Sequence, residues 1–382
     1  MNIIYIHQYF RPHEGLRSFE FIKHLTSKGH KVCVITAVSI AEDFAMENLQ
    51  VISTNTKYSN HMSKKQRIIS FAKFMVKATV KGLALKKADI VYATSTPLTV
   101  GFPALIIKKF KKCKMVFEVR DVWPDIPVEM GFITLKPVIS ILRFFEKLIY
   151  KNADQIVPLS KGMYENIKEK GVPEEKLTTI ENISNLYLYS PIDTIMEARK
   201  NEPFFCIHPG AMAVVNGLDF VLDTAKIVAE RDKEVEFLLI GGGNRKEALK
   251  KRVEEENITN VKIRDSVSKR EVASLTEKAS VGFMCVDTKY KILEDNSANK
   301  FFDFLAAGLP VVINYEGWQK EVLEIEQCGF SELTAEKMAE RILWIKNNPD
   351  IAQSYGRNSR KAAEKYSRDE ATRKLDTIIN TI

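Results

Sequence analysis

Short apolar segments alternate with amphipathic segments along the whole chain. The first cycle contains an apolar stretch "NIIYIH", a loop "QYFRPHEG", an amphipathic stretch "RSFEFIKHLTSKG" that Gly29 closes, and a second apolar stretch "KVCVIT". Apolar runs of this length between turn residues are typical of buried parallel strands. In the amphipathic stretches between them, apolar residues recur every three or four positions, which is the period of a helix. Repetition of strand and helix predicts an α/β protein with doubly wound parallel sheets.

The alternation occurs twice. After a break between Asn182 and about Asn201, it restarts at "FFCIHPG" and continues through "VEFLLIGGG", "NVKI", "VGFMCV" and "VVIN". A chain of 382 residues also exceeds one ordinary core. We therefore predict two Rossmann-like domains facing a central cleft, at residues 1–185 and 186–365. A last helix at 366–382 could pack on either half, including back on the amino-terminal domain.

Composition narrows the class of protein. Hydrophobic residues make up 45% and charged residues 28%, as in globular proteins. No apolar run approaches the roughly 20 residues of a membrane span, and the amino terminus lacks the pattern of a secretory signal. The five cysteines are scattered and lack metal-ligand spacing, which fits a reducing cytoplasm. We expect a cytoplasmic protein.

The net charge of +8 is concentrated in Met62–Lys87 and Lys108–Lys114. The first segment predicts a helix with an apolar row and a lysine row on different faces. The apolar row is Ile68, Phe71, Phe74 or Met75, and Ala78; the lysine row is Lys73, Lys77 and Lys81. One interpretation is a packed helix with a solvated face, and the other is a face that rests on anionic lipid. Nucleic acid is disfavoured because no recognised binding motif accompanies the charge.

Candidate binding residues follow the predicted strands of the first half, where parallel sheets place ligands. Gly15 and Arg17 follow the first strand, Ser95 follows "DIVYAT", and Arg120 and Asp121 follow "KMVFEV". Simpler interpretations stay open, because Gly15 could only turn the chain and Arg17 could be solvated. Arg120 and Asp121 could form a surface ion pair or orient a substrate hydroxyl.

In the second half, two glycine-containing loops and one helix start are candidates for phosphate. Gly210 lies between a strand and a helix, where bare amides can meet an anion. In "LEDNSANKFFDFLAAGLPVV" we expect Ser297 or Asn299 to cap a helix, with Asp295 before it and Asp303 on its first or second turn. Neither a Rossmann dinucleotide fingerprint nor a P-loop occurs in register. His7 and His208, at strand ends, are interpreted as structural.

These segments together resemble the family 4 glycosyltransferases, which have the GT-B fold. The resemblance covers nearly the whole chain and rests on "QYFRPHEGLRSFEFIKHLTSKGHKVCVIT", "ADIVYATSTPLTVGFPAL", "VFEVRDVWPD", "ADQIVPLSKGMYENIKEKGVPEEKLTTIENISN" and "NSANKFFDFLAAGLPVV". It implies that Asp295 contacts the donor sugar, that Asp303 binds the ribose, and that Lys300 and the amides from Asn299 onward meet a diphosphate. Asp121, held by Arg120, is implied as an alternative base.

The resemblance further implies a retaining, metal-independent transferase without a cofactor. Its donor would be a nucleotide diphosphate sugar, with uridine as the base and an acetamido sugar as the group transferred. Its acceptor would be an undecaprenyl-diphosphate-linked saccharide at the inner face of the cytoplasmic membrane, in O-antigen or capsule synthesis. An epimerase or hydrolase of the same fold and a catalytically silent binding partner stay open. The chain departs from the family in carrying two aspartates for glutamates and no basic residue near Val214.

Overall fold

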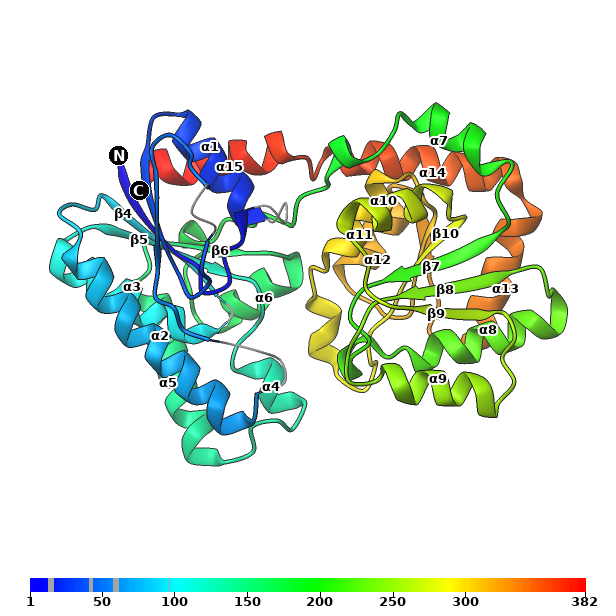
Figure 1. The fold of residues 1–382 in the computed structure, drawn as a ribbon, viewed down its shortest axis with the longest axis horizontal. Helices are drawn as coiled ribbons and strands as arrows, with labels where there is room; N and C mark the ends of the chain where they lie inside the picture. Colours follow the sequence, from blue (N-terminus) through cyan, green and yellow to red (C-terminus); the bar gives the residue numbers. More distant parts are fainter. Residues whose placement is uncertain (13–16, 41–43, 58–61, 96) are drawn as a thin grey trace. The chain divides into compact units, whose positions relative to one another are not determined.

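The computed structural model describes residues 1–12, 17–40, 44–57, 62–95 and 97–382. Gly15 lies outside the described residues. The chain divides into two compact units: unit 1 is Met1–Glu181 with Ala371–Ile382, and unit 2 is Asn182–Glu370. The predicted fold class is confirmed, because each unit contains a six-stranded parallel sheet with flanking helices (Figure 1).

The sheet of unit 1 has the order β3-β2-β1-β4-β5-β6. Its strands are β1 (Asn2–Ile6), β2 (Lys31–Thr36), β3 (Leu49–Ser53), β4 (Ile90–Thr94), β5 (Lys114–Val119) and β6 (Gln155–Pro158). Strand order reverses direction between β1 and β4, so the chain switches there from one half of the sheet to the other. Ligands of open parallel sheets bind at the carboxyl ends of the strands beside such a switch.

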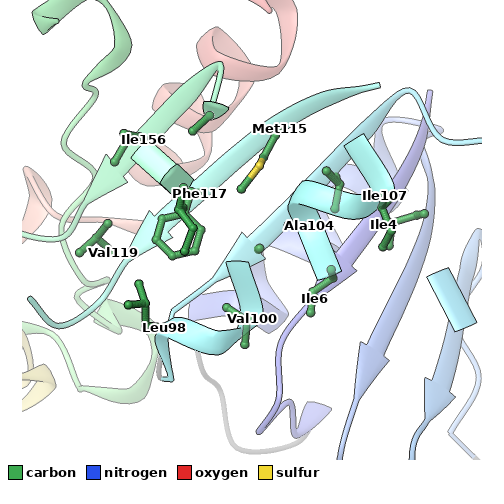
Figure 2. Close-up of a cluster of buried hydrophobic side chains, with 14 of the residues drawn as sticks. Ile4, Ile6, Leu98, Val100, Ala104, Ile107, Met115, Phe117, Val119 and Ile156 are labelled. Carbon is green, nitrogen blue, oxygen red and sulfur yellow. The ribbon is translucent and has the colours of Figure 1, made fainter. Parts of the chain in front are cut away.

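The helices of unit 1 are α1 (Arg17–Ser27), α2 (Lys64–Ala84), α3 (Gly101–Lys111), α4 (Asp125–Glu129), α5 (Lys136–Asn152), α6 (Lys161–Glu169) and α15 (Arg368–Thr381). Helices α2, α3 and α5 cover one face of the sheet, and their inward side chains share one core with β1, β4 and β5. Figure 2 shows Ala104 and Ile107 of α3 packed over Ile4 and Ile6 of β1. The last helix, α15, is tied to α1 by a 2.8 Å contact between His24 and Asp376.

The sheet of unit 2 has the order β12-β11-β10-β7-β8-β9. Its strands are β7 (Phe205–Pro209), β8 (Glu236–Ile240), β9 (Val261–Arg264), β10 (Val281–Met284), β11 (Val311–Ile313) and β12 (Gly329–Ser331). Its helices are α7 (Ile192–Arg199), α8 (Asp219–Arg231), α9 (Lys246–Glu255), α10 (Lys269–Lys278), α11 (Asn299–Ala306), α12 (Trp318–Ile325), α13 (Ala335–Asn347) and α14 (Pro349–Glu364). The switch here lies between β7 and β10.

Helix lengths follow from the layers that the helices cover. Most span two to five turns, as expected for helices that each cross one face of a sheet. Within the described residues, we find no helix with the length and apolarity that a bilayer crossing requires.

Candidate functional site

Helix α11 starts without a side-chain cap. Its N-cap residue is Ala298, whose N–H donates to the Asn296 Oδ1 at 3.2 Å, and the predicted caps Ser297 and Asn299 are wrong. Asn299 is the first helical residue instead, and the Ser297 hydroxyl is buried without a partner. The first-turn amides of α11 are therefore not satisfied by a capping side chain, which leaves them able to meet an anion.

The other end of α11 is satisfied by two arginines. Arg199 donates to the carbonyl oxygens of Ala307 and Gly308 at 2.7 and 2.6 Å, and Arg360 donates to that of Ala306. Positive side chains at this end complement the negative end of the helix dipole. Side chains of the protein thus bind the carbonyl groups at the carboxyl end of α11, whereas no side chain caps the N–H groups at its amino end.

Lys300, on the first turn of α11, reaches the end of β7. Its Nζ lies 3.0 Å from the Nε2 of His208. The His208 Nδ1 lies 2.9 Å from the carbonyl oxygen of Phe283, so Nδ1 carries the hydrogen and Nε2 accepts from Lys300. Burial and the Lys300 charge hold the pKa of His208 well below its ordinary value, so the ring is neutral. Burial also lowers the pKa of Lys300 to about 8.

Gly210 makes room for the Lys300 side chain. At φ 145° a side chain is disfavoured there, and a Cβ would lie 3.1 Å from Nζ and 3.2 Å from Cε of Lys300. The loop after β7 is itself held closely, because a Cβ on Gly241 would lie 1.8 Å from the Gly210 carbonyl oxygen. The ammonium group therefore occupies a fixed position between the end of β7 and the start of α11.

The two aspartates lie on either side of this position in the chain. Asp295 ends the short 3₁₀ segment Lys291–Asp295 and is half-buried. Asp303 lies on the second turn of α11 and accepts from the Asn185 amide at 3.3 Å. Burial raises the pKa of Asp303 despite the nearby Lys269 charge and the bond from Asn185.

A segment that sequence reasoning assigned to the first domain holds this site. Asn182 donates to the Ser297 carbonyl at 2.5 Å, and Ser184 donates to the Phe302 carbonyl at 3.3 Å. Together with Asn185, these side chains anchor the start of α11 and belong to unit 2. Their spacing, N-x-S-N, follows the last apolar stretch of the first half, but nothing in the sequence identifies their partners.

A second polar group lies at the carboxyl ends of the strands of unit 1. The Arg17 Nε lies 2.9 Å from the Glu118 carboxylate, with both side chains almost fully buried, and Arg17 also donates to the Glu181 carbonyl. Tyr92 and Thr94 donate to the same carboxylate at 2.8 and 2.7 Å. The simpler interpretation of Arg17 as a solvated residue is wrong. Glu118 was not predicted from the sequence, because it is one charged residue within an otherwise apolar strand.

Charge and hydrogen bonds keep Glu118 ionised. Burial opposes its charged form, but Arg17, Arg120 and the bonds from Thr94 and Tyr92 outweigh burial and leave its pKa below the ordinary value. Burial and the Arg120 charge also lower the pKa of His7, to about 3. The group therefore combines a paired carboxylate with a neutral imidazole.

The remaining predicted residues of unit 1 follow β4 and β5. The buried Ser95 hydroxyl accepts from the Arg120 backbone N–H at 2.9 Å, which joins the two strand ends. Arg120 and Asp121 are both half-buried. The Arg120 charge acts on Glu118 and His7, so its electrostatic partners include residues that sequence reasoning did not name. Roles for Asp121 and Arg120 in the reaction stay predictions.

Family comparison agrees with this division of the chain. Residues 16–182 match the model of a glycosyl transferase 4-like domain, and residues 204–348 match that of glycosyl transferases group 1. Two six-stranded parallel sheets and these two matches define a glycosyltransferase of the GT-B fold. The chain belongs to glycosyltransferase family 4, as the resemblance implied.

Two curated relatives are similar in sequence. The chain is 24% identical over 232 residues to an uncharacterized glycosyltransferase, MJ1178, of Methanocaldococcus jannaschii, covering 59% of each chain. It is 21% identical over 272 residues to a putative colanic acid biosynthesis glycosyl transferase, WcaI, of Escherichia coli K12, covering 65% of this chain and 66% of the relative. The alignments thus span less than two thirds of each relative.

Solved structures share the fold at low identity. Sucrose-phosphate synthase from Thermosynechococcus elongatus superposes with a TM-score of 0.78 at 14% identity, over 99% of this chain and 98% of the other. HepE from Anabaena, in complex with UDP-glucose, superposes with a TM-score of 0.71 at 14% identity over the whole of both chains.

Proposed function

We propose that the protein is a retaining glycosyltransferase that takes a sugar from a nucleotide diphosphate donor. The observation that carries this is the position of Lys300, whose ammonium group lies between the end of β7 and the uncapped start of α11. An ammonium group and free helix amides together suit a diphosphate. Asp295 and Asp303, on either side in the chain, supply acceptors for hydroxyl groups of the donor sugar and of the ribose.

Lys300 and the α11 amides act on the leaving group. In the transfer, the bond between the anomeric carbon and the diphosphate oxygen breaks, and negative charge develops on that oxygen. Fixed donors aimed at developing charge are the strongest electrostatic aid that a protein offers, because they need no reorganisation. The acceptor hydroxyl attacks from the face that the diphosphate leaves, its proton passes to the released phosphate oxygen, and no metal ion is required. Asp121 is the alternative proton acceptor.

The donor is UDP linked to an acetamido sugar, and the acceptor is a lipid-linked saccharide of a surface polysaccharide at the inner face of the membrane. UDP-glucose in the Anabaena structure supports uridine, and colanic acid synthesis, named for the Escherichia coli relative, supports a polysaccharide. The test is calorimetric titration with UDP, UDP-glucose, UDP-N-acetylglucosamine and GDP. We expect UDP and one of its sugars to bind and GDP not to bind, and binding of none of them would refute the donor assignment.

A catalytically silent sugar-nucleotide binder is the second candidate. It is favoured by Val214, which is 38% exposed at the start of the short 3₁₀ segment Val214–Asn216, where the family usually carries a basic residue. Product analysis separates the candidates. A transferase extends a lipid-linked acceptor and releases little free sugar, a hydrolase or epimerase changes the donor alone, and a silent binder leaves both unchanged.

A further inference from the structure

Exposed apolar side chains gather on one layer of unit 1. Of the seventeen large hydrophobic side chains that are exposed in the described part of the chain, twelve lie between residues 68 and 148. On α5 they include Ile141, Phe144 and Leu148, at 66%, 69% and 37% exposure. Spacings of three and four residues place these three on one side of the helix. We call them the α5 row.

Helix α2 carries a second row of this kind. Ile69, Val76 and Val80 are 53%, 56% and 62% exposed, and their spacing also places them on one side of the helix. We call them the α2 row. The inward side of α2 is formed by Phe74 and Ala78. The predicted packing face was therefore partly wrong, because its first member, Ile68, is 66% exposed.

Neither row is needed for the core of unit 1. Helices α2, α3 and α5 are neighbours on one face of the sheet, and the core is completed by their inward residues (Figures 1 and 2). The outward rows consequently point away from the sheet on the same layer. Exposed apolar side chains gathered on one layer in this way mark an interaction site.

The same layer carries a strong excess of positive over negative charge. The sequences of α2, α3 and α5 contain thirteen lysine and arginine residues and a single acidic residue, the buried Glu146. The three helices thus carry a charge of +12, whereas the whole chain carries +8, so the rest of the chain is net negative. The partner of this layer must therefore be both apolar and anionic.

A basic pocket adjoins the α5 row. It has a volume of ≈ 810 Å³ and is lined by Arg143, Lys147 and Lys151 of α5, and by Lys170 and Lys176. Its two carboxylates already have positive partners, since Lys170 lies 2.6 Å from both Asp125 and Glu146 and Arg143 lies 3.9 Å from Asp125. Within the described chain, no carboxylate pairs with Lys147 or Lys151. These two ammonium groups lie beside the apolar row and can meet phosphate.

We propose that the outward faces of α2 and α5 dock on an anionic phospholipid bilayer, with a lipid phosphate in the pocket beside α5. Apolar side chains flanked by unpaired lysines match acyl chains below phosphate groups. A second copy of the chain fits poorly, because the same layer on two copies would bring two sets of positive charges together. The lipid surface expected from the basic segments Met62–Lys87 and Lys108–Lys114 is thereby extended to α5.

The inference deepens the lipid-linked acceptor of the proposed function, and its test needs neither donor nor acceptor. The full chain is sedimented with vesicles of phosphatidylcholine alone and with added phosphatidylglycerol. We expect binding only to the anionic vesicles. If the protein does not bind anionic vesicles, the proposed transfer reaction is not refuted. If the protein shows no transfer activity, the proposed docking surface is not refuted.

Matched variants locate the surface. Ile141→Ser/Phe144→Ser should lower partitioning on the order of tenfold for each side chain that enters the bilayer, whereas Ile325→Ser, at a 76% exposed site on α12, should not. Lys147→Glu/Lys151→Glu should lower it roughly fivefold or more per residue, and Lys250→Glu/Lys251→Glu on α9, with the same change in charge, should lower it far less. Equal effects of the α5 variants and their controls would overturn the proposal. The proposal would also be overturned if the wild type were a dimer, and if Ile141→Ser/Phe144→Ser dissociated that dimer without changing vesicle binding.

Discussion

The Nζ of Lys300 lies 3.0 Å from the Nε2 of His208, and the imidazole is fixed by its bond to the Phe283 carbonyl. Because the ring is neutral and accepts, it orients the ammonium group without neutralising it. The cation is thus held ready for an anion at the cost of partial desolvation. That cost is visible in its pKa of about 8, well below the ordinary lysine value.

Removing the Lys300 charge should slow transfer strongly. In Lys300→Met, only the helix amides stabilise the charge on the diphosphate leaving group. Loss of one such donor lowers the rate on the order of a hundredfold or more. Initial rates with saturating acceptor measure this. Lys291→Met, an exposed change of the same type, is the control, and a Lys300→Met enzyme with unaltered rate would contradict the role given to this residue.

Nucleotide affinity should fall as pH rises above about 8. Free Lys300 loses its proton near that pH, whereas a bound diphosphate favours the charged form, so binding takes up a proton there. Affinity for UDP should drop by up to about tenfold per pH unit. The diphosphate of UDP is already fully ionised in this range, because the second phosphate pKa is about 6.

The control for that titration is Lys300→Arg. Arginine stays charged throughout the range. The UDP affinity of this variant should therefore not change between about pH 7 and about pH 9, one unit on either side of the Lys300 pKa of about 8. Isothermal titration in buffers of different ionisation enthalpy counts the protons directly. Proton uptake by Lys300→Arg equal to that of the wild type would assign the effect to another group.

The two aspartates should separate sugar recognition from nucleoside recognition. Asp303→Ala removes the acceptor assigned to the ribose, so it should weaken UDP and UDP-sugar alike. Asp295→Ala should weaken the UDP-sugar and leave UDP unchanged. Each lost hydrogen bond to a charged group is worth about 1.5–3 kcal/mol. Titration of both ligands against both variants gives four affinities, and the reverse pattern would exchange the two roles.

The fold was predictable because buried parallel strands leave continuous apolar runs. The start of α11 was located correctly from Phe301, Phe302 and the stop at Gly308, yet its cap was not. Neither predicted residue caps the helix, and the Asn296 side chain instead accepts from the Ala298 N–H just before the first turn. Side-chain bonds between loop residues depend on backbone path, and spacing alone does not determine that path.

Long-range partners account for the rest of what was missed. His208 meets Lys300 across 92 residues of chain, and Arg17 meets Glu118 across 101. Neither pair has a local pattern, and Glu118 within "KMVFEV" resembles any charged residue at a strand end. The outward rows of α2 and α5 were obscured for a related reason. A helix with apolar residues on two faces does not show from its sequence which face meets the sheet.

The buried pair of Arg17 and Glu118 should dominate the stability of unit 1. Arg17→Met leaves the Glu118 carboxylate buried without its cation, and breaking a buried pair in this way costs about 3–5 kcal/mol. Urea denaturation followed by circular dichroism measures the change. Arg143→Met, at a 60% exposed side chain with a 3.9 Å contact, should change the free energy of unfolding by no more than about 0.5 kcal/mol.

The pH dependence of that loss identifies its origin. In the wild type, the lowered pKa of Glu118 contributes stability above the unfolded-state value of 4.5, and this contribution is lost as pH falls. Without Arg17, burial dominates and raises the pKa of Glu118. Lowering the pH then protonates Glu118 and removes its buried charge. The difference between wild type and Arg17→Met should therefore shrink from pH 7 to pH 4 (about the range in which carboxyl groups protonate). A constant difference would mean that lost packing on Phe21, over which Arg17 lies at 4.4 Å, causes the effect instead of charge.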